Sequence, residues 1–86
     1  MNIHVSNLSI NTINDDLKRL FATYGTVNTA VIVRDEWKGS SKGTALIDML
    51  DAGEAAQAIS DLNNTMLHGK IISVSEITYS IRDNTN

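Results

Sequence analysis

The chain has 86 residues, which is enough for one small domain and too few for two. Its hydrophobic fraction of 42% and charged fraction of 20% are typical of a soluble globular protein and exclude a disordered chain. The lack of cysteine excludes disulfides and thiolate metal sites, and the net charge of −3 disfavours a protein that grips nucleic acid mainly through its phosphates.

The first half of the chain alternates between strand and helix patterns. Residues 2–7 alternate apolar and polar side chains, which predicts a half-buried strand. Apolar residues then recur at helical spacing over residues 17–24, and Asn14 is expected to cap that helix. Residues 27–35 are rich in β-branched side chains and predict a second strand.

The second half of the chain predicts a strand, a helix and a further strand. Residues 44–49 alternate again, and they should form an antiparallel hairpin with the second strand. Asp51 and Glu54 have the spacing of a capping box at the start of a second helix. Residues 71–75 predict the fourth strand, with residues 66–67 as a short extra strand before it.

The order β-α-β-β-α-β predicts an α+β fold, a ferredoxin-like sandwich in which two helices cover one face of a four-stranded antiparallel sheet. We expect residues 1–80 to form this domain and residues 81–86 to be a flexible tail. No apolar run is long enough to span a bilayer, and the first residues lack the pattern of a signal peptide. The sequence therefore predicts a cytoplasmic protein without a membrane partner.

Two local motifs resemble those of the RNA recognition motif (RRM) family. Residues 42–49, Lys-Gly-Thr-Ala-Leu-Ile-Asp-Met, fit the third-strand pattern K/R-G-F/Y-G/A-F-V-x-F/Y at its lysine, glycine and alanine. Residues 3–8, Ile-His-Val-Ser-Asn-Leu, match four of the six positions in the first-strand pattern I-F/Y-V-G-N-L. The resemblance covers about residues 1–78 and is greatest to the short, single-domain bacterial members. It implies binding of single-stranded RNA on the open sheet face.

The chain departs from the family at the positions where the family stacks RNA bases on aromatic rings. Those positions hold His4, Thr44 and Leu46, and only His4 keeps a planar ring. Stacking contributes about 1–3 kcal/mol per base, so the replacement predicts weak RNA binding with little sequence preference.

The resemblance and the strand alternation together give a set of candidate RNA contacts. His4 would stack on a base, the basic residues would meet phosphates, and the aliphatic residues would contact bases or sugars. Trp37 either stacks on a base or folds back onto the domain, and Tyr79 either stacks or covers the sheet. The full set is His4, Ser6, Val31, Val33, Arg34, Trp37, Lys38, Lys42, Thr44, Leu46 and Tyr79.

A second hypothesis assigns the same face to a protein partner or a homodimer. Val31, Val33, Leu46 and Ile71 would make it more apolar than a solvated sheet requires. An enzyme is the least favoured class, because no histidine and carboxylate are arranged to activate a serine or threonine. No cofactor is expected. The two histidines are too few for a metal site, and His68 is expected to be only a turn residue.

Overall fold

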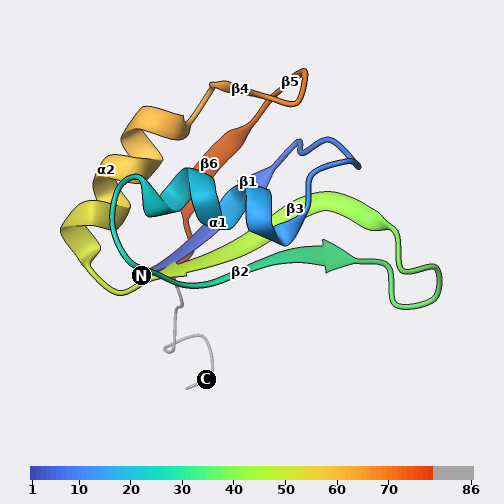
Figure 1. The fold of residues 1–86 in the computed structure, drawn as a ribbon, viewed down its shortest axis with the longest axis horizontal. Coiled ribbons are helices and arrows are strands. Elements are labelled where there is room, and N and C mark those ends of the chain that lie inside the picture. The colour runs from blue at the N-terminus through green and yellow to red at the C-terminus, as the bar shows by residue number, and fades with distance from the viewer. Residues whose placement is uncertain (79–86) are drawn as a thin grey trace, which may run out of the picture.

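Four strands of alternating apolar and polar residues form one antiparallel sheet, and two amphipathic helices cover one of its faces (Figure 1). This computed structural model describes residues 1–78, so Tyr79 and the predicted tail lie outside the described residues. Neither helix within those residues is long and apolar enough to cross a membrane. The elements are β1 (Asn2–Ser6), α1 (Asn14–Ala22), β2 (Val27–Arg34), β3 (Ser41–Met49), α2 (Ala52–Leu62), β4 (Met66–Leu67), β5 (Lys70–Ile71) and β6 (Ser73–Glu76).

The sheet has the strand order β2-β3-β1-β6, and each neighbouring pair is antiparallel. The two strands that carry the family-like motifs, β1 and β3, are therefore adjacent and central. Ile3 lies opposite Ile47, and Val5 lies opposite Ala45. The predicted α+β, ferredoxin-like sandwich is confirmed.

The core lies between the helices and the sheet face that they cover. Phe21 and Leu17 of α1 are fully buried against the alternate, inward-facing residues of β1 and β3. Burying an aliphatic or aromatic side chain of this size stabilises the fold by about 1.5–3 kcal/mol, which fixes the helices on this face. The buried core residues are Ile3, Val5, Leu8, Leu17, Phe21, Ile32, Ala45, Ile47, Met49, Ala55, Ala58, Leu62, Ile72 and Val74.

The predicted fourth strand is divided in two. The short extra strand at residues 66–67 is present as β4, and it pairs with β5 in a separate two-stranded ladder that includes Ile71. The Ile72 N–H donates to the Thr65 carbonyl at 2.9 Å, so residue 72 is bound to the segment after α2 and not to β1. Pairing with β1 begins only at Ser73. The placement of Ile71 on the four-stranded sheet was therefore wrong.

The two predicted helix caps have different outcomes. Asp51 does cap α2, and its side chain accepts a hydrogen bond from the Glu54 N–H at 2.9 Å. The prediction for Asn14 is wrong, because the capping residue of α1 is Ile13. The Asn14 side-chain oxygen instead accepts a hydrogen bond from the Ile32 N–H at 2.8 Å and ties the start of α1 to β2.

Candidate nucleic-acid interface

The open face of the sheet carries a row of side chains that crosses all four strands. Val31 on β2 pairs with Leu46 on β3, Leu46 pairs with His4 on β1, and His4 pairs with Ser75 on β6. The residues next to them along β1 and β3 are buried under the helices, so this row faces the other way. Val31 is 51% exposed and Leu46 is 45% exposed. We call these four residues the cross-strand row.

A bulge ends the regular β2–β3 ladder beside this row. Ile32 pairs with Ala45 but Arg34 pairs with Ser41, so residues 42–44 lie opposite Val33 alone. Gly43 has φ +77°, and a Cβ at this position would lie 3.3 Å from the Leu8 carbonyl oxygen. The lysine-glycine start of the third-strand motif therefore forms an irregular strand entry at which Lys42 is exposed.

Lys42 and Thr44 line a shallow pocket of about 330 Å³ at this end of the sheet. Lys70, from the β4–β5 hairpin, lines the same pocket, and no carboxylate is among the described residues that do so. Asn7 connects this end of the sheet to the β4–β5 hairpin, because its side-chain amide donates to the Ile71 carbonyl at 2.7 Å. Two ammonium groups beside hydroxyl and amide groups suit a phosphate or a sugar. No sequence pattern pointed to Lys70, because only the β4–β5 hairpin brings it to Lys42.

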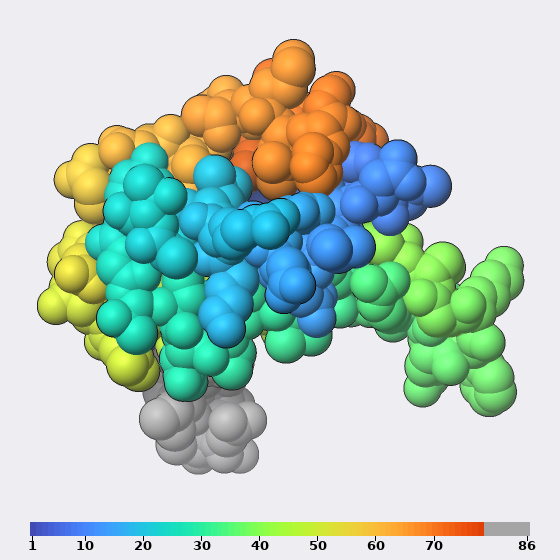
Figure 2. Space-filling view, viewed as in Figure 1, coloured from blue at the N-terminus to red at the C-terminus, as the bar shows by residue number. Residues whose placement is uncertain are grey.

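The β2–β3 hairpin carries Trp37 and Lys38 away from the body of the domain, where it projects in light green in Figure 2. Asp35 holds the turn: its Oδ1 accepts hydrogen bonds from the N–H groups of Trp37 and Lys38, both at 2.9 Å. Trp37 is 89% exposed, so the interpretation that it folds back onto the domain was wrong. The Arg34 guanidinium donates to the Gly39 carbonyl at 3.3 Å and is partly engaged in the same loop.

A second pocket, of about 330 Å³, lies on the open face beside the cross-strand row. It is lined by Val31 and Leu46 together with residues absent from the predicted set: Asn2, Thr29, Ile47, Asp48 and Ile77. Strand alternation does place Thr29 on the open face, two residues before Val31. The second bulge in β2 acts on Val27, which pairs with buried Met49 and packs against the core, while Thr29 pairs with Asp48.

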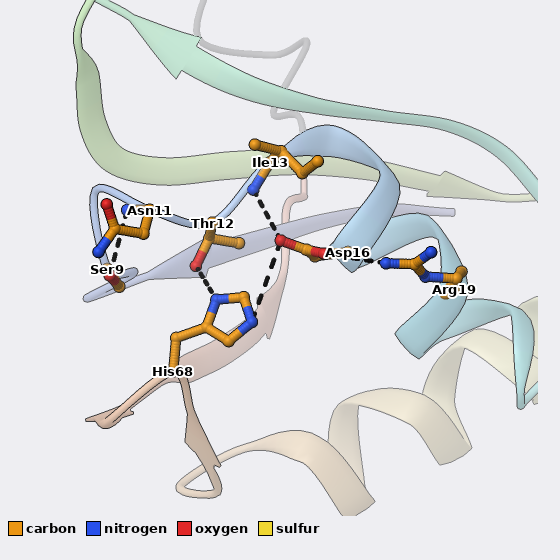
Figure 3. Close-up of polar contacts among 7 residues, drawn as sticks. All are labelled: Ser9, Asn11, Thr12, Ile13, Asp16, Arg19 and His68. Carbon is orange, nitrogen blue, oxygen red and sulfur yellow. Dashed lines mark hydrogen bonds and ion pairs between the residues drawn. The ribbon is translucent and has the colours of Figure 1, made fainter.

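His68 does more than occupy a turn. Its backbone has the positive φ of a turn residue, 50°. Its side chain also makes contacts: the ring Nδ1 lies 3.0 Å from the Thr12 hydroxyl, and Nε2 lies 4.0 Å from a carboxylate oxygen of Asp16 (Figure 3). Thr12 is the only polar residue buried among residues 1–78. A buried hydroxyl requires a hydrogen-bond partner, and His68 supplies it. His68 therefore fastens the β4–β5 hairpin to the start of α1.

The pKa of the Asp16 carboxyl lies below its ordinary value, mainly because the Ile13 N–H donates to it at 3.0 Å. Desolvation opposes this effect, while His68 and Arg19 add to it. A lowered pKa in the folded state means that the carboxylate stabilises the fold above its unfolded-state pKa and that this contribution is lost as the pH falls through the folded-state value.

We therefore expect Asp16→Asn to lower the urea midpoint at neutral pH, with a difference from the parent protein that shrinks as the pH falls below about 4. Urea unfolding at a series of pH values measures this difference. Asp15→Asn, which removes a neighbouring exposed carboxylate of the same helix turn, is the control and should show a smaller effect. A difference for Asp16→Asn that is the same at every pH would contradict the assignment.

Comparison with known proteins decides the family. Residues 3–73 match the family model described as the RNA recognition motif. The chain belongs to the RNA recognition motif family. As an RRM domain, it is an RNA-binding module.

Individual proteins agree with this assignment. The chain is 38% identical over 73 residues to the human zinc finger CCHC-type and RNA-binding motif-containing protein 1, and the match covers 85% of this chain and 34% of that protein. The crystal structure of RNA binding protein PG1 superposes with a TM-score of 0.89 at 32% identity, over 93% of this chain and 96% of that one. A Sex-lethal protein–RNA complex superposes with a TM-score of 0.86 at 30% identity, over 92% of this chain and 47% of that one.

The RRM domain described here spans about a third of the length of its first curated relatives. Those relatives are eukaryotic, so the resemblance to bacterial members stays a prediction. The structure brings the predicted sheet residues together in one surface but places Trp37 and Lys38 on the projecting hairpin. Their roles in RNA binding, and the role predicted for Tyr79, also stay predictions.

Proposed function

We propose that this RRM domain binds short single-stranded RNA on its open sheet face, weakly and with little sequence preference over the bound strand as a whole. The observation that supports the proposal is the cross-strand row, which offers RNA a continuous surface on the side opposite both helices. Among residues 1–78, this surface holds one ring, that of His4, where the family uses several. Fewer stacking rings mean a lower affinity.

The proposed contacts divide by chemistry. His4 stacks on one base, and the aliphatic side chains of Val31 and Leu46 pack against the next. Ser6 and Thr44 extend the surface with hydroxyl groups toward the pocket that holds Lys42 and Lys70. The two lysines contact phosphates.

The projecting hairpin adds a second proposed region of contact. Trp37 is exposed at its turn and offers a base a flat indole surface, while Lys38 beside it and Arg34 at its base meet phosphates. Val33 is half-buried between the hairpin and the cross-strand row, and it connects these two proposed regions of RNA contact. The role of Tyr79 as a further stacking or covering residue is part of the same proposal. A cytoplasmic location is also proposed, on the basis of composition.

The test is a titration of mixed-sequence single-stranded RNA oligonucleotides, followed by the amide shifts of the domain in NMR spectra. We expect shifts in β1, β3 and the β2–β3 hairpin, with the amides of α1 and α2 unchanged. Silence of β1 and β3 at about 1 mM RNA, a concentration at which even weak complexes form, would overturn the proposal.

A second candidate function, self-association, is favoured by one observation: Val31 and Leu46 expose aliphatic surface beside Ile77 on the open face. Sedimentation at increasing protein concentration tests it, with Leu46→Ser as the variant that removes the apolar contact. A dimer that is lost in the variant would support this function. A monomer at all concentrations would contradict it.

A further inference from the structure

The geometry points to Asp48 as the residue that selects one base of the bound RNA, and to guanine as the base that it selects. The inference rests on the proposed function, because it assumes that RNA lies on the open sheet face. It adds a preference at a single position to binding that is otherwise indifferent to sequence.

The pocket beside the cross-strand row has an apolar side and a polar side. Val31, Leu46 and Ile77 supply the hydrocarbon, and Asn2, Thr29 and Asp48 supply the polar groups. Strand pairing brings these residues together, since Thr29 lies opposite Asp48, Asp48 lies opposite Asn2, and the Ile77 N–H donates to the Asn2 carbonyl at 2.8 Å. Its volume of about 330 Å³ is at the lower end for small-molecule sites.

Asp48 faces this pocket with unused hydrogen-bonding capacity. The side-chain amide of Asn28 donates to its Oδ2 at 2.9 Å, and the amino group of Met1 lies 3.5 Å from its Oδ1. An ionised carboxylate has about four acceptor sites, so these contacts leave each oxygen able to accept another hydrogen bond. The side chain is 31% exposed and can therefore be reached by a ligand. The Asn28 contact also fixes its orientation.

A carboxylate accepts hydrogen bonds and donates none, so it distinguishes bases by the donors on their edges. Guanine presents two adjacent donors, N1–H and the N2 amino group, which match the two oxygens of a carboxylate. Cytosine and adenine present an amino group next to an acceptor. Uracil presents a single N–H between two carbonyl oxygens, which a carboxylate repels. We therefore expect the order guanine first, cytosine and adenine next, and uracil last.

The backbone of the RNA does not provide this selectivity. The phosphates are the same whichever base is present, and a carboxylate repels them without regard to sequence. Asp48 should therefore reduce the affinity for every RNA slightly while raising the ratio between guanine and uracil. A carboxylate that only repels RNA would lower the affinity for every RNA without changing the ratio between guanine and uracil.

The experiment uses uridine oligonucleotides in which one central base is uracil, cytosine, adenine or guanine, so that guanine quadruplexes cannot form. Dissociation constants are measured by fluorescence anisotropy for the parent chain, for Asp48→Asn and for Asp15→Asn. Asp48→Asn keeps the shape of the side chain but replaces one acceptor oxygen by a donor. Asp15→Asn makes the same charge change on α1, on the helix-covered side. The methyl signals of Val31, Leu46 and Ile77 report whether the base enters the pocket.

We expect the parent chain to favour the guanine-containing oligonucleotide over the all-uridine one by about fivefold or more, the discrimination of one bidentate pair. Asp48→Asn should remove that ratio and Asp15→Asn should preserve it. Equal binding of all four oligonucleotides, or a ratio that survives Asp48→Asn, would overturn the inference and leave the proposed function standing. Binding of none of them would overturn the proposed function itself.

Discussion

Replacing Thr44 and Leu46 together by tyrosine is expected to tighten the binding of single-stranded RNA by about one to several powers of ten, because each base stacked on a ring contributes about 1–3 kcal/mol. Both positions belong to β3 in the centre of the sheet, and Leu46 lies directly opposite His4. Leu46 is 45% exposed, so a tyrosine ring at that position has room above the sheet. Fluorescence anisotropy with a labelled mixed-sequence oligonucleotide measures the gain.

The control for this variant places the same two rings on the helix side of the domain. Ala56 and Ser60 are exposed on α2 and lie one turn apart, so their replacement by tyrosine adds equal aromatic surface away from the sheet. An equal gain in both double variants would show that tyrosine promotes RNA binding unspecifically. No gain from the sheet variant would contradict the assignment of the open face as the RNA platform.

Truncating Trp37 to alanine is expected to weaken RNA binding by about 1–3 kcal/mol, the contribution of one stacked base. The stability of the fold should change by less than about 0.5 kcal/mol, since the indole is exposed and Asp35 holds the turn through backbone N–H groups that the substitution keeps. Titration with the same oligonucleotide and urea unfolding measure the two effects. Leu50→Ala, at an exposed apolar position beyond the far end of β3, is the matched control.

Trp37 also gives an independent signal, because it is the only tryptophan in the chain. Its emission should be quenched when RNA binds, since a base would then stack on an indole that is otherwise open to solvent. Unchanged emission at RNA concentrations that shift β1 and β3 would confine the binding surface to the sheet. In that case, Trp37→Ala should also leave the affinity for RNA unchanged.

The fold was predictable because each helix and strand is determined mainly by residues that are close together in the sequence. Alternation in β1 and β3, helical spacing around Leu17 and Phe21, and the Asp51 cap each depend on residues near one another in the chain. The incorrect predictions concern contacts between distant segments. Asn14 bonds to β2 and not to its own helix, and His68 bonds to Thr12 across 56 positions of sequence. No local pattern indicates such partners.

The candidate site was predictable to the same extent. Strand alternation placed His4 and Leu46 on one face correctly, and pairing made them direct neighbours. It could not indicate that Thr29 lies opposite Asp48 or that Val27 turns toward the core, because the pairing register and the bulge between Val27 and Thr29 determine both. Bulges are irregularities of pairing, and a single strand read alone does not reveal them.

The cross-strand row has a thermodynamic consequence for the complex with RNA. Val31 and Leu46 put hydrocarbon in the middle of a surface that the family usually covers with rings, and the chain carries a net negative charge. Association through such a surface removes apolar area from water, which gives a negative change in heat capacity. The four phosphate contacts proposed for Arg34, Lys38, Lys42 and Lys70 would add a separate electrostatic contribution that falls with added salt. Calorimetry across temperature would therefore measure the apolar part of this surface, and a salt titration would measure the basic part.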